Sequence, residues 1–313
     1  MATSGSYDYT IKRDEFLKDC LVEIGAVAEE DTVSSATNEH ASRKLNLLLK
    51  ALQGKGLNLW KAKRATLLLQ KSQRSYNLGP SGDHFFLESE LIETTMRVAG
   101  VTNDTVLEVA STTGMVAADY IGVELDSGSM HFTTIQSITD SDTLVLTTGL
   151  PSAAAIDRVI YTYTTKAQRP LNIIEAWRRT KDNTDTPIIP PISREEYARQ
   201  GDKFTAGTIN RIYYDTQLTN GVLYVMQPAS VVSDTLEMWV HYPVEDMDAA
   251  LNEFDCPTEW LLAIQLNLQL LLCPKYGIQG TQLKTIASLA DMYLTMAEGS
   301  DKEMTSIYVT PDN

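Results

Sequence analysis

The segment that most constrains the fold lies near the C-terminal end, at residues 253 to 277, and reads EFDCPTEWLLAIQLNLQLLLCPKYG. Asp255 and Pro257 suit a helix start, because a carboxylate can accept from free backbone N–H groups and proline loses no hydrogen bond at the first helical position. Pro274 predicts the end of the helix after Cys273. The predicted helix therefore has about 17 residues and a length of about 25 Å.

This helix is too short and too polar to be a membrane span. A span needs about 20 mostly apolar residues, and the amides of Gln265, Asn267 and Gln269 would be costly in lipid. At about 100° per residue, apolar side chains lie on every side of the helix, which favours burial against several neighbours. Two interpretations stay open: a central core helix, or a helix with an amide-bearing face that packs on another subunit. The residues predicted for subunit packing are Trp260, Gln265, Asn267 and Gln269.

Composition and charge limit the partners of the chain. It has 313 residues, 43 % of them hydrophobic, and a formal net charge of −15, which argues against a surface evolved for tight phosphate binding. Residues 40 to 80 carry nine basic and no acidic residues. This basic run could meet an acidic partner or nucleic acid, or form a solvated helix face that balances acidic surroundings.

The cysteines and the first residues indicate the compartment. Cys20, Cys256 and Cys273 show no metal or redox spacing, which predicts reduced, buried thiols. The opening sequence MATSGSYDYT lacks the basic-then-apolar order of a signal peptide. We therefore expect a soluble protein that is made in a cytoplasm.

The N-terminal half predicts helices followed by strands. Residues 16–24 and 41–52 each repeat apolar side chains at helical spacing, and glycines follow both stripes. The run ATLLLQK is a candidate strand, and SYNLGPSGDHFF reads as a turn-rich connection. Between 90 and 165, short alternating runs separated by turn signals predict an inserted all-β sandwich or barrel.

Residues 166 to 299 combine strands and helices. LNIIEAWRR and TLEMWVHY are predicted strands, and Asn220-Gly221 predicts a hairpin. Ser193 and Glu196 fit the capping box of a short helix, and residues 283–297 repeat apolar side chains in one helical register. The predicted fold class is therefore α+β, with a helical bundle core, a small antiparallel β element and the inserted all-β domain.

The motifs of common enzymes are missing from the sequence. It has no phosphate-binding G-x-x-x-x-G-K-[ST], no nucleophile elbow, no H-E-x-x-H and no paired cysteine clamp. The four histidines are dispersed, and the many carboxylates do not by themselves place two on one sugar. We predict that the protein is not an enzyme and binds no metal or cofactor.

The order of the predicted elements resembles the head-to-tail adaptor (connector) proteins of short-tailed bacteriophages, the podoviruses. The resemblance covers nearly the whole chain outside the β insertion. It rests on the linear order of the elements and on short stretches of similar sequence. Its most specific pieces are YYDTQLTNGVLYV, PTEWLLAIQLNLQLLLCPKYG and the closing TSIYVTP.

The resemblance implies a structural virion protein at the interface of head and tail, assembled in the bacterial host cytoplasm. Copies of the chain would form a dodecameric ring below the portal protein, meet tail nozzle or tail fibre proteins, and let genomic DNA pass without specific binding. Residues 1–89 and 166–299 would form the adaptor core, 90–165 the inserted all-β domain and 300–313 an extended portal-binding tail. The tail residues predicted to bind the portal are Thr305, Ile307, Tyr308 and Val309.

Two alternatives remain at this point. The chain could be a tail or fibre-attachment protein that uses its β domain for a partner, which is compatible with the adaptor interpretation. It could also be an envelope-degrading hydrolase, which the missing catalytic constellation disfavours.

Overall fold

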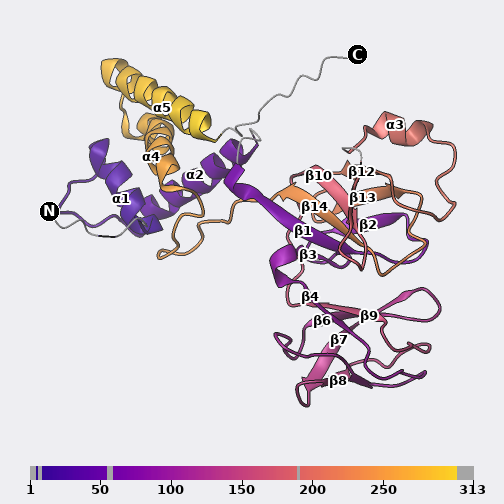
Figure 1. The fold of residues 1–313 in the computed structure, drawn as a ribbon. Helices are drawn as coiled ribbons and strands as arrows, with labels where there is room; N and C mark the ends of the chain where they lie inside the picture. The colour runs from indigo at the N-terminus through magenta and orange to yellow at the C-terminus, as the bar shows by residue number, and fades with distance from the viewer. Residues whose placement is uncertain (1–4, 6–8, 55–58, 189–190, 302–313) are drawn as a thin grey trace. The chain divides into compact units, whose positions relative to one another are not determined.

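The computed structural model describes residue 5 and residues 9–54, 59–188 and 191–301 (Figure 1). The chain divides into two compact units. The first, which we call the helical unit, contains the residues up to Lys61 and those from Val244 onward. The second, the β unit, runs from Ala62 to Pro243. The β unit is thus inserted between two halves of the helical unit along the sequence.

In the helical unit, α4 packs against three other helices. The elements are α1 (Arg13–Glu23), α2 (Ser35–Gln53), the 3-10 turn η1 (Leu59–Lys61), α4 (Thr258–Leu272), the 3-10 turn η3 (Cys273–Tyr276) and α5 (Gly280–Ser300). α4 contacts α1, α2 and α5, and one hydrophobic cluster joins them. The helices predicted from the apolar stripes at 16–24, 41–52 and 283–297 are confirmed by α1, α2 and α5.

The ends of α4 differ from the prediction in detail. Pro257 is the N-cap and receives no side-chain cap, because Asp255 instead pairs with the ammonium group of the buried Lys61. After Leu272 the chain does not leave the helix axis at Pro274 but tightens into η3, where proline occupies an early position. Gly277 then ends this turn in the left-handed region, at φ 74°, a conformation that glycine adopts without steric cost.

Two sheets share the main core of the β unit. The first has the order β11-β10-β14-β1-β3 and the second the order β12-β13-β2. Their strands are β1 (Ala62–Leu68), β2 (Ser75–Leu78), β3 (Phe85–Leu87), β10 (Asn172–Arg179), β11 (Asp185–Ile188), β12 (Arg211–Asp215), β13 (Gly221–Met226) and β14 (Thr235–His241). Alternate residues of β14, namely Leu236, Met238 and Val240, enter the shared core as predicted. The predicted Asn220-Gly221 hairpin joins β12 to β13, and α3 (Arg194–Arg199) begins with the predicted capping box.

The third sheet of the β unit lies wholly within residues 90 to 165. Its order is β4-β9-β6-β7-β8-β5, and its strands are β4 (Ile92–Thr95), β5 (Val106–Glu108), β6 (Tyr120–Glu124), β7 (Met130–Ile138), β8 (Thr143–Leu146) and β9 (Val159–Tyr163). It has its own core around Ile121, Leu144 and Ile160. A further cluster joins it to the first sheet, since Met130, Tyr161 and Tyr163 pack with Leu68, Phe86 and Val232.

The predicted fold class is wrong. The described chain is mostly β, with three sheets and only 28 % helix, and a helical bundle is not its core. Strands β2, β3 and β11 lie in stretches that the sequence analysis predicted to be turns and extended connectors. The number of strands was therefore underestimated, and the sheets were not recognised as a core. The long-range pairing of β1 with β14, from Ala62↔His241 to Leu68↔Thr235, builds the sheet that periodicity alone does not reveal.

Candidate functional site

Trp260 lies inside the helical unit. Its ring is buried and packs at a tilt on Trp60, with 4.9 Å between ring centroids. A small cavity beside the two rings is also lined by Leu49, Leu52 and Ile264. At about 20 Å³ it has room for one water molecule. The indole N–H of Trp60 is buried and has no partner within the described ranges, so it is the group that such a water would bind.

Two of the three amides of α4 have hydrogen-bond partners within the same chain. Gln269 is buried and donates from its amide to the Glu23 carboxylate of α1. The amide nitrogen of Asn267 donates to the carbonyl oxygen of Ala263 at 2.8 Å and to that of Ala290 in α5 at 3.4 Å. Gln265 is half-buried, and its backbone carbonyl accepts from the Cys20 thiol at 3.9 Å. The structure therefore brings Gln269 to α1 and Asn267 to α5, and the role of these residues in subunit packing stays a prediction.

The other predicted site residues, Thr305, Ile307, Tyr308 and Val309, lie outside the described residues. Their predicted role in binding the portal stays a prediction.

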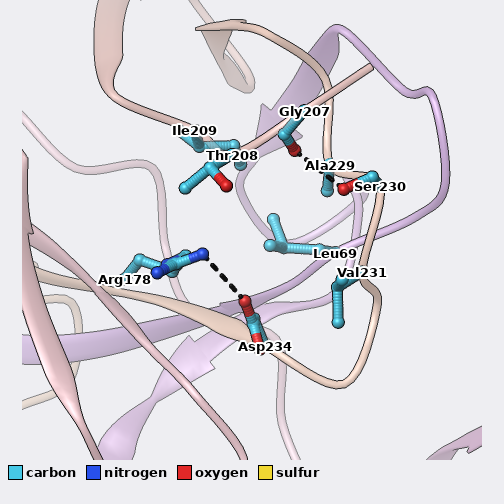
Figure 2. A pocket seen from close by; sticks show the side chains of 9 residues that line it. All are labelled: Leu69, Arg178, Gly207, Thr208, Ile209, Ala229, Ser230, Val231 and Asp234. Atoms are coloured by element: carbon cyan, nitrogen blue, oxygen red, sulfur yellow. Dashed lines mark hydrogen bonds and ion pairs between the residues drawn. The ribbon is translucent and has the colours of Figure 1, made fainter.

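A small polar pocket lies in the β unit between the loop at 207–209 and the loop at 229–234 (Figure 2). Arg178 and Asp234 form its charged wall, with 3.4 Å between Nη1 and Oδ2. The Nε atom of Arg178 is buried and has no hydrogen-bond partner among the residues that the structure describes. The cavity measures about 20 Å³, so it can hold one bridging water and has no room for an organic substrate.

One face of the five-stranded sheet carries a network of charged residues. The fully buried Glu237 on β14 accepts from the hydroxyls of Thr66 at 2.8 Å and Thr235 at 2.9 Å. Burial raises the pKa of Glu237, and the two hydroxyl hydrogen bonds oppose that rise. Arg179 binds Asp185 at 2.8 Å on the same sheet. Each charged group thus meets a protein partner, as expected of a structural ion network.

An open cavity of about 430 Å³ lies at the edge of that sheet, beside β10 and β11. Glu175, Trp177, Asp185 and Pro187 are among its lining residues. It combines two carboxylates with one indole, and among the described residues that line it there is no histidine, serine or cysteine that could serve as a nucleophile or paired base. Two carboxylates suffice for glycoside hydrolysis where they flank a sugar, but Asp185 is held here in an ion pair with Arg179, with 2.8 Å between Oδ1 and Nε.

His84 and the three cysteines are further reactive groups of the described chain, and all of them are buried or half-buried in the protein. Burial, with the nearby charge of Lys166, lowers the pKa of His84 to about 3, and its Nδ1 lies 2.7 Å from the Tyr163 hydroxyl. The three cysteines are free, with Cys20 and Cys273 buried, and burial raises the pKa of Cys256 to about 12. Within the described ranges no cluster of three His, Cys, Asp or Glu side chains could hold a metal ion.

The most unusual surface is on helices. Six large apolar side chains are exposed on α2, α4 and α5: Leu47, Leu262, Leu271, Leu289, Met292 and Met296. On α5 the apolar stripe predicted from the sequence faces the core, whereas Leu289, Met292 and Met296 form a second stripe that was not identified. Its signal was present, because these residues follow one another at i, i+3 and i+7 outside the predicted core face. In the part of the chain that the structure describes, none of the helices is long and apolar enough to cross a membrane.

Comparisons with known proteins leave the family open. No protein-family model matches the chain, and no curated protein matches it. Among solved structures it is similar to "MreC Lysteria monocytogenes", with 12 % sequence identity and a TM-score of 0.16 over 52 % of this chain and 78 % of the other. It is also similar to "VP17, a capsid protein of bacteriophage P23-77", with 10 % identity and a TM-score of 0.12 over 62 % of this chain and 79 % of the other. Scores this low carry no argument about fold or function.

Proposed function

We propose that this chain is a structural subunit of a ring, similar to the head-to-tail adaptors of short-tailed bacteriophages, that joins the portal to the tail and continues the DNA channel. The observation that carries the proposal is the set of large apolar side chains exposed on the helical unit. Apolar helix faces of this kind mark protein–protein contact sites when they are contiguous.

The organisation of the chain supports this proposal. The segments before and after the β unit both belong to the helical unit, so the β unit is an insertion along the sequence. The adaptor resemblance likewise places helices before and after β elements, although it takes residues 90–165 alone as the insertion, whereas the β unit runs from Ala62 to Pro243. Two small cavities also suit a structural subunit, since each has room for only a single water molecule.

The charge of the chain suits a channel for DNA. The net charge is −15, and each phosphate contact adds affinity that must be broken before DNA can move. A ring with net acidic character would let the genome pass without gripping it.

The direct test mixes the purified full-length protein with its portal ring and examines the particles by electron microscopy. A ring of density below the portal, with one copy for each portal subunit, is expected. A protein that stays monomeric in the mixture and leaves the portal bare would refute the adaptor role.

A second test addresses the tail. The double variant Ile307→Asp/Val309→Asp places two charges at the positions predicted to enter apolar sites, so portal binding should be lost. The matched control, Ser306→Asp/Thr310→Asp, adds the same charge at alternate positions and should bind as the wild type does. Equal binding of both double variants would exclude the tail as the portal clamp.

A further inference from the structure

The helical unit carries an acidic and apolar surface on α4 and α5. Leu289, Met292 and Met296 are 38 %, 42 % and 60 % exposed along α5, and Leu262 of α4 is 42 % exposed. The short connector from Cys273 to Gln279 makes the two packed helices antiparallel. Because Asn267 lies opposite Ala290, position 262 lies at the level of position 295, next to Met296. We call these four residues the α4–α5 face.

Carboxylates flank the α4–α5 face. Glu259 is exposed one turn before Leu262 on α4. Leu262 also shares a helix row with Gln269, which contacts Glu23 at the end of α1. Along α1, Glu15, Asp19 and Glu23 are exposed at successive turns. The rim on this side of α4 is therefore negatively charged.

A second apolar and charged surface lies on α2. Leu47 is 65 % exposed, whereas Leu45, Leu48 and Leu49 around it point into the core. Arg43 and Lys44 precede Leu47 by about one turn. The Arg43 guanidinium pairs with the exposed Glu39 at 2.6 Å, so the net positive charge beside Leu47 comes from Lys44. The pKa of His40 is lowered by partial burial and by the positive charges of Lys275, Lys44 and Arg43, which places these cations around one site. We call Leu47 with Arg43 and Lys44 the α2 face.

The two faces belong to different sides of the helical unit. α2 and α5 both pack on α4, and neither packs extensively on the other. α4 lies between α5 and α2 (Figure 1), so the side of each of these helices that faces away from α4 is also turned away from the other helix. A subunit with two distinct complementary surfaces can bind its neighbour head to tail, and such contacts close into a ring when the rotation permits.

We propose that the α4–α5 face of one subunit packs on the α2 face of the next copy of this chain. This inference rests on the proposed ring. Leu47 of one copy meets the leucines and methionines of its neighbour, and unbranched methionine adapts to such a contact. The cationic rim of α2 meets the carboxylates of α1 and α4. Pairing of two α4–α5 faces would bring like charges together, which disfavours a symmetric dimer through that surface.

The test uses cysteine cross-linking of the full chain in a Cys256→Ser background, with a short bismaleimide and with the portal present. The single variants Leu47→Cys and Met292→Cys should give no covalent dimer. The double variant Leu47→Cys/Met292→Cys should give a ladder that extends from dimer to the full ring. A mixture of the two single variants should stop at the dimer, because each copy then offers one reactive half of the contact.

The control is Leu47→Cys/Asp291→Cys, which keeps two exposed thiols and moves one to the other flank of α5. It should show no ladder. Covalent dimers of Met292→Cys alone would mean that the α4–α5 face pairs with itself, and would overturn the inference. Rings visible on the portal with no ladder in the double variant would also overturn it while leaving the adaptor role intact; a bare portal would instead refute the adaptor role.

Discussion

The helical unit and the β unit differ in where they expose large apolar side chains. In the helical unit, six of these side chains lie on regular helices, at Leu47, Leu262, Leu271, Leu289, Met292 and Met296. In the β unit most of them lie in loops, at Val98, Val101, Val116, Ile156, Phe204, Leu218 and Val231. A rigid helix holds apolar groups in a fixed array that a partner can match, whereas scattered loop residues are ordinary on a protein surface. We therefore expect the β unit to be complete by itself and the helical unit to gain stability from neighbours.

The tryptophans allow the two units to be followed separately. Trp60 and Trp260 belong to the helical unit, and Trp177 and Trp239 belong to the β unit. Replacing either pair by phenylalanine leaves tryptophan fluorescence from one unit only. The unfolding of each unit can therefore be measured separately in two otherwise identical experiments.

The largest effect is expected within the β unit, at Phe86→Ala. Phe86 is fully buried and stacks on Tyr163 at 3.9 Å between ring centroids, in the cluster that joins the first sheet to the third. The substitution should lower the free energy of unfolding of the β unit by about 3–5 kcal/mol. Denaturant unfolding followed through Trp177 and Trp239 should report this loss, and Trp60 and Trp260 should report little change. Equal losses by both probes would mean that the two units unfold together.

This shared cluster also changes what is expected of the β insertion. Its strand pattern predicts a self-contained domain, but removal of residues 90 to 165 would strip the partners from Leu68, Phe86 and Val232. We expect the shortened protein to expose these side chains and to bind a hydrophobic dye. A shortened protein as stable and as dye-free as the wild type would show that the cluster contributes little.

The next largest effect is expected in the helical unit, at Gln269→Ala. Gln269 is buried and contacts Glu23, and loss of a buried partner of a charged group costs about 1.5–3 kcal/mol. The helical unit should lose this much stability in the unfolding signal of Trp60 and Trp260, while portal binding below the melting temperature persists. Gln265→Ala, at a half-buried position, is the matched control and should cost less. If Gln269→Ala instead abolished ring formation without loss of stability, this amide would act between subunits.

These comparisons show how far the sequence alone could lead. The helices were predictable because α1, α2 and α5 each repeat apolar residues over several turns. Strands β3 and β11 span Phe85–Leu87 and Asp185–Ile188, which is too short for alternation to be visible. No local pattern shows that β1 pairs with β14, so the size of the β core and the fold class were predicted wrongly.

The candidate site was predictable to a smaller extent. The amides of α4 were identified from the sequence as candidate site residues. Their partners were not predictable, because Gln269 binds Glu23 of α1 and Asn267 binds Ala290 of α5, which are distant in the sequence. The exposed stripe of Leu289, Met292 and Met296 was readable from its spacing at i, i+3 and i+7 beside the predicted core face of α5, but it was not identified. The portal-binding tail remains a prediction from linear order.

A smaller effect is expected at Tyr161→Phe, again in the β unit. The Tyr161 hydroxyl donates to the carbonyl oxygen of Ser233 at 2.5 Å, in a buried contact between the third sheet and the loop before β14. Removing the hydroxyl leaves the ring packing intact and should cost about 1 kcal/mol. Calorimetry should show a lower melting temperature than the wild type. The variant Tyr213→Phe, on a half-exposed tyrosine, controls for loss of a hydroxyl at the surface and should be neutral.

The smallest effect is expected at Glu237→Gln and should depend on pH. Burial raises the pKa of Glu237 above its ordinary value of 4.5, with the hydroxyls of Thr66 and Thr235 acting in the opposite direction. A folded-state pKa above the unfolded one means that the folded protein holds the proton more tightly. The stability from this group is therefore complete below pH 4.5 and is lost as the pH rises through the folded pKa.

Glutamine is neutral at every pH, so Glu237→Gln should remove this loss. The free energy of unfolding, measured from pH 4 to 7 through Trp177 and Trp239, should rise relative to the wild type as the pH increases. Glu195→Gln, at an exposed residue of α3, serves as the control and should leave the difference flat. A Glu237→Gln difference that is flat or falls with pH would show that the two threonines and Arg179 stabilise the carboxylate more than burial destabilises it.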